Sequence, residues 1–400
     1  IVGHIGTASL AGLSLAGTLL DAALALSNFL TYATTAHTGR YHASGQERLL
    51  QAVAAQSLWL SVALGCALAA IGLLLGSPAV TLLGGGGQVA VLAGLYLRIG
   101  VLGLPFALVA LAGQGYLRGK GDLRTPLVLV VGGNVLNVVL ELLFVYGFGW
   151  GLAGSAWDTV IAQACMGAGF IAGLWRDSKG ARRPQFLEMR PLLRTSSHIL
   201  VRTSALYSSF VVASAVLARV GATSLAAHQV LFQLWIFLAL VLDAIAIAGQ
   251  VIVSRKLGAG LKEGAVSASR RMIGWSVLVG IVLAAVMLAL SGVLPRLFTD
   301  DPAVLERVSA AWPIFASMQP LNGAVFALDG ILIGAGDSRY LMLAMLLSSL
   351  VAVPLVLVAL VAGWGIVGVW LALLVLIIVR LATMACRFAL GRWIVTGVSV

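Results

Sequence analysis

Charged residues and cysteines are both scarce in this chain of 400 residues. Only 10% of the residues are charged, while 60% are hydrophobic. A typical soluble domain carries about 25% charged residues, so the composition excludes an ordinary soluble protein. The three cysteines, Cys66, Cys165 and Cys386, stand singly in apolar segments. Their spacing suits neither disulfide pairing nor metal binding, and we expect them to fill the hydrophobic core.

Sequence motifs of the common enzyme classes are also lacking. We find no glycine-rich phosphate loop with its lysine, no metal-spaced histidines or cysteines and no Ser-His-Asp set. We therefore predict that the protein is not an enzyme and that it holds no cofactor or metal. An integral-membrane transferase is the enzyme class left as an alternative, but it would need clustered His or Asp at one membrane face, which we do not find.

Long apolar runs are what the chain has in abundance. They repeatedly reach about 20 residues or more, the length of a membrane-spanning helix. The runs are continuous rather than alternating, which favours helices over a transmembrane β-barrel. We predict an all-α integral membrane protein with helices near residues 10–36, 49–76, 88–115, 125–147, 151–175, 195–218, 228–253, 269–294, 305–333, 340–362 and 365–390.

The chain contains an internal duplication with an offset of 215 residues. Two Gly-Asp turns, residues 119–124 and 334–339, share the pattern Gly-x-Gly-Asp-x-Arg, and in each we expect the Asp to cap the next helix. Pro105 and Pro320 stand at the same offset inside long predicted helices, where we expect equivalent kinks. Matches at one spacing along the whole chain indicate two copies of one unit.

The repeat also predicts the boundaries of the two copies. The helix near 195–218 would have its first-copy counterpart almost entirely before Ile1. We therefore expect two parallel six-helix repeats, with twelve helices if complete and about eleven in this chain. The N-terminal lobe would be residues 1–175, with most of its first helix missing, and the C-terminal lobe residues 195–400. A basic connector, residues 176–194, would join them.

Most of the 25 lysines and arginines fall in one set of alternate predicted loops. Positively charged loops stay in the cytoplasm. We therefore predict a multi-pass protein of the cell (inner) membrane, with the Gly-Asp turns, the 176–194 connector and the C-terminus in the cytoplasm. The net charge of +11 is then a topology signal, and we expect no nucleic-acid partner. Arg380 is counted with these loops, and Arg202 is expected to be an anchor at the membrane interface.

Acidic residues inside predicted spans are candidate functional groups, because an ionisable group in a membrane is costly. The strongest is Glu141, with Asn137 four residues earlier on the same helix face. A tight turn at 147–153 would bring Asp158 and Thr159 of the next helix to the same depth. Carboxylate, amide and hydroxyl groups at one level suit a proton or small-cation site. The alternative is a carboxylate held by a helix-packing hydrogen bond.

Asp243 and Asp329 are secondary candidates in the second copy. That copy has apolar residues at the positions equivalent to Asn137 and Glu141. The first-copy counterparts of Asp243 and Asp329 are Asn28 and Gln114. These groups could couple ion movement to a transport cycle, or they could bridge helices structurally, and the sequence leaves both readings open. Asp21 has no obvious polar companion, and we expect it to have no coupling role.

Several motifs resemble those of a known transporter family. The first copy contains Gly115-Tyr116-Leu117-Arg118-Gly119 and the pair Asn137 and Glu141. With these motifs the chain resembles the multidrug and toxic compound extrusion (MATE) transporters along essentially its whole length. Motifs of the second copy resemble the DinF-like branch of that family, namely Ala226-Ala227-His228-Gln229, Leu242-Asp243, Gly249-Gln250, Leu257-Gly258-Ala259-Gly260, Asp329-Gly330 and Gly334-Ala335-Gly336-Asp337.

The resemblance implies two six-helix lobes around a central cavity that opens alternately to either side. Cationic or amphipathic organic compounds would leave in antiport with protons or Na⁺. In the family, an Asn/acid pair on the fifth helix forms part of a first-lobe coupling site, and Asn137 and Glu141 match that pair. Thr159 matches a polar position on the sixth helix. Asn322 stands where Na⁺-coupled members place an acid, so protons are favoured over Na⁺.

The partners implied are small organic substrates and the lipid bilayer, and we expect a monomer. The alternative within the same superfamily is a flippase for lipid-linked precursors. Such a protein would have a more basic cavity, whereas arginine is scarce in the predicted spans.

Overall fold

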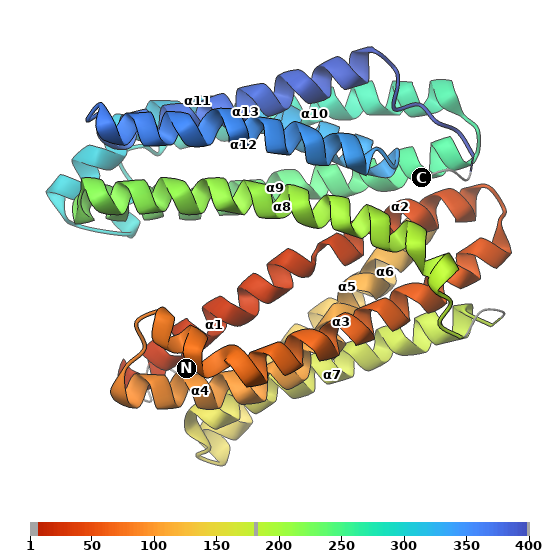
Figure 1. Ribbon diagram of the computed structural model, residues 1–400, viewed down its shortest axis with the longest axis horizontal. Helices are drawn as coiled ribbons and strands as arrows, with labels where there is room; N and C mark the ends of the chain where they lie inside the picture. The colour runs from red at the N-terminus through yellow and green to blue at the C-terminus, as the bar shows by residue number, and fades with distance from the viewer. Residues whose placement is uncertain (1–6, 180–182, 398–400) are drawn as a thin grey trace. The chain divides into compact units, whose positions relative to one another are not determined.

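The computed structural model describes residues 7–179 and 183–397, which form helices and turns with no β-strand (Figure 1). The chain divides into two compact units, residues 1–196 and 197–400. The predicted all-α fold is confirmed. Residues Ile1–Gly3, the predicted remnant of a first helix, lie outside the described residues. Residues 180–182 of the predicted connector also lie outside the described residues. The first and last residues of that connector, 176–177 and 186–194, belong to helices.

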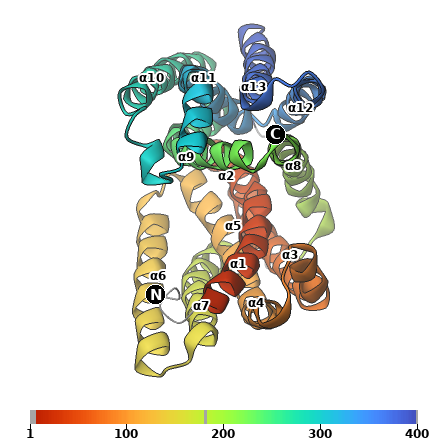
Figure 2. The ribbon, with the colours of Figure 1, turned by 90° about the vertical axis from the view of Figure 1, so that its left-hand side faces the viewer.

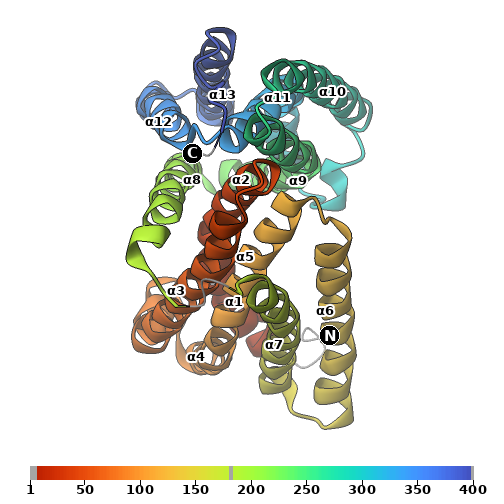
Figure 3. The same cartoon turned by 90° about the vertical axis from the view of Figure 1, so that its right-hand side faces the viewer.

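In the first unit a central helix packs against three others. The central helix is α5, and its partners are α2, α3 and α7. Helix α1 packs on α4, and α6 packs mainly on α7, as Figures 2 and 3 show. The helices are α1 (Thr7–Ser27), α2 (Phe29–Ala43), α3 (Glu47–Leu82), α4 (Gly87–Gly100), α5 (Leu104–Lys120), α6 (Arg124–Leu142) and α7 (Gly151–Asp177).

The second unit is built in a similar way around α11, which packs against α9, α10 and α13. Helix α12 packs mainly on α13. Helix α8 begins in the first unit and continues into the second. The bounds are α8 (Phe186–Val220), α9 (Ala222–Gly258), α10 (Lys262–Ala289), α11 (Pro302–Gly334), α12 (Ser338–Val361) and α13 (Gly365–Ala389).

Glycines at the repeat offset let the central helix of each unit approach its neighbour closely. A Cβ atom on Gly115 of α5 would collide with the backbone of Thr31 on α2. A Cβ atom on Gly330 of α11 would collide with the backbone of Ala246 on α9. Small residues at such contacts are typical of helix packing in membranes. Gly115 and Gly330 are 215 residues apart, and so are Thr31 and Ala246, so the duplication extends to the packing itself.

The two prolines at the repeat offset have different effects. Pro105 lies in the first turn of α5, directly after a 3₁₀ turn, Val101–Gly103, that separates α5 from α4. Pro320 lies inside α11, which runs through it without a break in the helix. The structure therefore interrupts the helix at the first proline and carries it on through the second.

All three cysteines are exposed on the surfaces of their helices. The expectation that they fill the core is therefore wrong. Large apolar side chains are exposed in the same way, for example Leu74 at 77% and Leu350 at 72%. In a membrane protein the lipid-facing surface is as apolar as the core, so an apolar sequence context does not distinguish the two.

Ten helical segments of the described chain are long and apolar enough to cross a membrane. Helix α11 is not one of them. It carries Gln319, Asn322 and Asp329, all of which are buried. These polar groups are sheltered because the helices of the second unit pack around α11.

Candidate functional site

Two neighbouring helices of the first unit bring an amide, a carboxylate and a hydroxyl together. Asn137 Nδ2 on α6 donates to Asp158 Oδ1 on α7 at 3.2 Å and to Thr159 Oγ1 at 3.3 Å. The Thr159 hydroxyl is placed to donate to Asp158 Oδ1 at 2.9 Å or to the Ser155 carbonyl oxygen at 3.1 Å. We call Asn137, Glu141, Asp158 and Thr159 the carboxylate cluster.

A tight helical hairpin sets the depth of these residues. After α6 the chain makes a π-helical turn, Leu143–Gly147, and α7 begins at Gly151. Gly149 and Gly151 have φ angles of 70° and 56°, in the left-handed region that favours glycine. The rings of Phe144 and Trp150 pack across the turn with their centroids 5.0 Å apart. The turn therefore fixes the register of α6 against α7.

Asp158 is the most enclosed member of the carboxylate cluster, with 1% of its surface exposed. Its Oδ2 atom is buried and has no hydrogen-bond partner among the described residues. The ion pairs of the described chain do not include it either. A carboxylate held away from both water and cations is costly in its charged form, which makes it a functional candidate.

Glu141 is the second carboxylate of the carboxylate cluster, and Tyr96 borders the cluster. Glu141 lies one turn beyond Asn137 on α6, is partly exposed and interacts electrostatically with Asp158. Tyr96 of α4 is buried, and its hydroxyl interacts with Thr159. The sequence analysis did not predict a role for Tyr96. The one feature that could have indicated it was a polar phenol hydroxyl inside an apolar span. The sequence analysis also ranked Glu141 first, whereas Asp158 is the more buried of the two carboxylates.

The second unit contains a buried ion-pair cluster. Asp329 of α11 is 4% exposed and pairs through Oδ2 with both Arg202 of α8 and Arg380 of α13. The structure therefore shows the helix-bridging role that the sequence left open for Asp329. We call these three residues the arginine–aspartate cluster.

Two expectations about arginine were wrong. Arg202 was expected at the membrane interface, but its side chain is only 12% exposed and pairs with Asp329. Arg380 was counted with the cytoplasmic loops, but it lies inside α13 and is 2% exposed. An intramembrane arginine is tolerated when a carboxylate on another helix pairs with it. The hydropathy of a segment gives no information on whether a residue of another helix pairs with its arginine.

The remaining candidates have varied surroundings. Asn28 is exposed at the break between α1 and α2. Gln114 accepts a hydrogen bond from Arg118 at 3.0 Å. Asp243 is partly buried on α9. Asn322 is 1% exposed, and its Oδ1 atom has no hydrogen-bond partner among the described residues.

The two Gly-Asp turns are held in different ways. Asp122 Oδ1 accepts from the backbone N–H groups of Arg124 and Thr125 at 3.1 and 3.0 Å and so caps α6, as predicted. Hydrogen bonds from the Thr125 side chain and from these N–H groups lower the pKa of Asp122. Asp337 instead accepts two hydrogen bonds from Arg387, at 2.7 and 3.2 Å. The predicted second cap is wrong because the guanidinium is the stronger, charge-assisted partner.

The fold and the carboxylate cluster define the class of protein. It is a multi-pass α-helical membrane protein with a duplicated unit and a buried carboxylate in each copy, Asp158 and Asp329. A family model described as MatE matches residues 1–143 and 199–358, and the chain therefore belongs to the MatE family of multidrug and toxic compound extrusion transporters. The family predicted from the motifs is confirmed.

Individual relatives agree with this assignment. The chain is 31% identical to Protein DETOXIFICATION 42 of Arabidopsis thaliana over 305 residues, which cover 74% of this chain and 56% of that protein. It therefore spans a little over half the length of that relative. It is 27% identical to DNA damage-inducible protein F of Escherichia coli over 393 residues, 95% of this chain and 84% of that protein.

A solved structure shows the same fold. The crystal structure of MATE in the bent conformation has a TM-score of 0.88 to this chain at 20% identity. The likeness covers 98% of this chain and 88% of that one.

Proposed function

We propose that this protein is a secondary active transporter that exports cationic or amphipathic organic compounds in antiport with protons. Membership of a family of transporters supports the transport step. The carboxylate cluster supports the choice of protons and of cationic substrates, because it places two carboxylates inside a membrane-spanning unit.

The observation that carries the proposal is the position of Asp158. It is buried, held by Asn137 and Thr159, and interacts with the second carboxylate of Glu141. A proton bound by either carboxylate removes one of two neighbouring negative charges. A cationic substrate attracted to the same charges then competes with that proton, and such a negative coupling between two ligands is the basis of antiport.

Protons fit the residues better than Na⁺. Asn322 on α11 is a neutral amide at the position where the family resemblance implies an acid in Na⁺-coupled members. The carboxylate cluster itself contains oxygen atoms of the kind that bind small cations. Transport measured with and without Na⁺ therefore distinguishes coupling to protons from coupling to Na⁺. Asp243 and Asn28 are kept as secondary coupling candidates.

We place the protein in the cell (inner) membrane as a monomer that works by alternating access. The Gly-Asp turns, the 176–194 connector and the C-terminus would face the cytoplasm, because alternate loops hold most of the lysine and arginine.

The proposal is tested with purified protein reconstituted into liposomes that contain a cationic fluorescent dye. Dye movement is followed with and without an imposed pH gradient, in the absence of Na⁺. We expect transport that requires the gradient and stops when a proton uncoupler is added. Equal rates with and without the gradient would show that protons do not drive the cycle.

One observation favours the alternative of a flippase for lipid-linked precursors. Two buried arginines, Arg202 and Arg380, pair with a single carboxylate in the second unit. The interior of this unit therefore carries more positive charge than the sequence analysis expected. The same liposomes distinguish the two functions when they carry a fluorescent lipid-linked phosphate in place of the dye. Movement of that lipid without movement of the dye would favour the flippase.

A further inference from the structure

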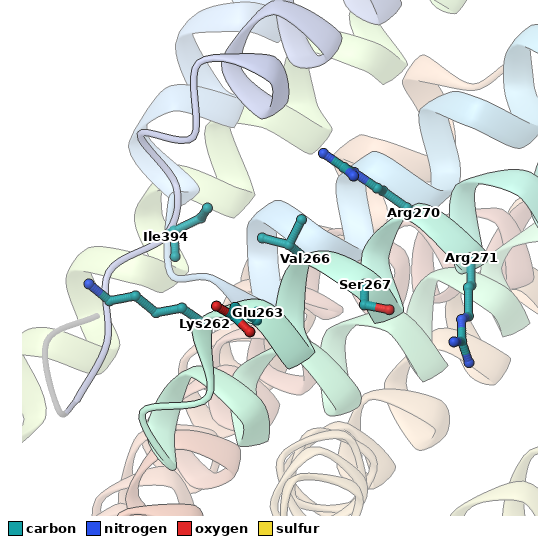
Figure 4. A pocket seen from close by; sticks show the side chains of 7 residues that line it. All are labelled: Lys262, Glu263, Val266, Ser267, Arg270, Arg271 and Ile394. Carbon is teal, nitrogen blue, oxygen red and sulfur yellow. The ribbon is translucent and has the colours of Figure 1, made fainter.

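A basic cavity lies at the start of α10, outside both clusters described above. It has a volume of about 450 Å³ and is bordered by the first turns of α10 and by Ile394 (Figure 4). Three cationic side chains, Lys262, Arg270 and Arg271, line it together with one carboxylate, Glu263. The cations are exposed, and the ion pairs of the described chain include none of them. Their positive charge is therefore available to a ligand.

The far wall of the cavity is fixed in place. Trp393, next to Ile394, is 1% exposed and stacks on Phe388 with ring centroids 5.2 Å apart. The Trp393 indole N–H donates to the Phe388 carbonyl oxygen at 3.1 Å. The backbone N–H of Gly397 donates to the Leu257 carbonyl oxygen on α9 at 3.1 Å. The segment that carries Ile394 is thus tied to the helices around it.

The repeat shows that these arginines are not required by the architecture of the unit. The first-copy positions equivalent to Arg270 and Arg271 are Ala55 and Gln56, which are 2% and 1% exposed. There Gln56 donates to the carbonyl oxygen of Arg183 at 3.1 Å, in a packing role. The two arginines of the cavity therefore have no cationic counterparts in the first copy.

An exposed apolar stripe continues from the cavity along α10. Trp275, Leu278 and Val282 follow Arg271 at intervals of three or four residues, which places them on one helix face. Their exposed fractions are 65%, 48% and 53%. The face of α10 that carries Arg271 therefore changes from cationic to apolar within about one turn, near the end of the helix that our topology assigns to the cytoplasm.

From this arrangement we infer that α10 carries a binding site for an anionic phospholipid of the cytoplasmic leaflet. The phosphate binds at Arg271, Arg270 adds to the local positive charge, and the acyl chains lie along Trp275 and the residues that follow it. Glu263 accepts hydrogen bonds from headgroup hydroxyls, which favours a polyol headgroup such as that of phosphatidylglycerol. Basic pockets at the cytoplasmic side of membrane helices bind phospholipid headgroups through this chemistry.

The test is native mass spectrometry of the purified full chain in a neutral detergent, titrated with phosphatidylglycerol, phosphatidylcholine or inorganic phosphate. We expect phosphatidylglycerol to bind more tightly than phosphatidylcholine. Each surface cation accounts for about fivefold in affinity for an anionic lipid, so R270Q/R271Q is expected to bind phosphatidylglycerol about 25-fold more weakly. The matched control R190Q/R339Q removes two exposed cations from other helices and is expected to leave the affinity unchanged.

A further variant separates a lipid from a free phosphate. If the ligand is a phospholipid, Trp275→Ala weakens binding of phosphatidylglycerol, because the acyl chains lose their contact with the indole. Competition by millimolar inorganic phosphate together with an unaffected Trp275→Ala variant would overturn the lipid assignment. Equal affinity for phosphatidylcholine, or an unchanged R270Q/R271Q variant, would overturn the site. Unaltered elution on gel filtration confirms that each variant is folded.

Discussion

The Asn137 amide donates to the Asp158 carboxylate at 3.2 Å, from the C-terminal part of α6 to the N-terminal part of α7. This bond holds the carboxylate that the proposed proton coupling depends on. It leaves the second carboxylate oxygen of Asp158 buried and without a hydrogen-bond partner among the described residues.

Replacing either carboxylate of the cluster is expected to stop transport. Asp158→Asn and Glu141→Gln keep the shape of the side chain but remove its ability to bind a proton. Dye export by reconstituted protein under a pH gradient should fall to the background of protein-free liposomes. Asp21→Asn is the matched control, since Asp21 is exposed on α1 and has no coupling role in our proposal. Normal export by both cluster variants would move the coupling group to Asp243.

Na⁺ is expected to be dispensable. With choline in place of Na⁺ on both sides of the liposome membrane, export driven by a pH gradient should be unchanged. A Na⁺ gradient at uniform pH should produce no export, because Asn322 has no charge with which to attract the ion. Export driven by Na⁺ alone would contradict the proton assignment and leave the rest of the proposed cycle intact.

Asp329→Asn is expected to destabilise the protein strongly. It leaves the buried guanidinium groups of Arg202 and Arg380 without their carboxylate, and breaking a buried pair costs about 3–5 kcal/mol. Asp337→Asn is the comparison, because Asp337 and Arg387 are more exposed than the Asp329 cluster and loss of their pair is expected to cost less. Thermal unfolding in detergent should show a clearly larger loss for the Asp329 variant. Equal losses would contradict the assigned role of the arginine–aspartate cluster.

Gly330→Ala is expected to cost about 1–3 kcal/mol, because the added methyl group meets the backbone of Ala246 and forces α11 away from α9. Gly274→Ala on α10 is the control. Its added methyl group meets no atom within 4 Å, and alanine improves helix stability there by up to about 1 kcal/mol. The two unfolding temperatures should therefore shift in opposite directions. A Gly330→Ala protein as stable as the parent would show that the helix contact is looser than described.

Asp122→Ala is expected to lower stability by about 1 kcal/mol through loss of the helix cap, while Asp122→Asn keeps most of it. The pKa of Asp122 is lowered in the folded protein, so the charged cap stabilises at pH values above the unfolded pKa. That contribution is lost as the pH falls through the folded value. Unfolding measured from pH 5 to 8 should therefore show a constant difference between parent and alanine variant, narrowing only below about pH 4. A difference that varies between pH 5 and 8 would point to another group.

Sequence patterns alone determined the helices and the repeat. Apolar runs of spanning length specify helices locally, because a backbone in lipid must satisfy its own hydrogen bonds. The Gly-Asp turns showed the duplication, and motifs along both copies, the Asn137 and Glu141 pair among them, indicated the family. The proximity of Asn137 and Asp158 could also be predicted from the sequence. A short hairpin places its two helices side by side, and the depth of each residue follows from its distance in sequence from the turn.

Only the tertiary structure decided which polar groups are buried and with which partners. Asp158 proved more enclosed than Glu141, Tyr96 joined from α4, and Asp329 was paired with Arg202 and Arg380 from two other helices. These relationships depend on the rotation of each helix about its axis and on contacts between residues far apart in the chain. A sequence with apolar residues on all sides of a helix carries no periodic signal for that rotation, so the lipid-facing and inward sides became distinguishable only once the helices were packed.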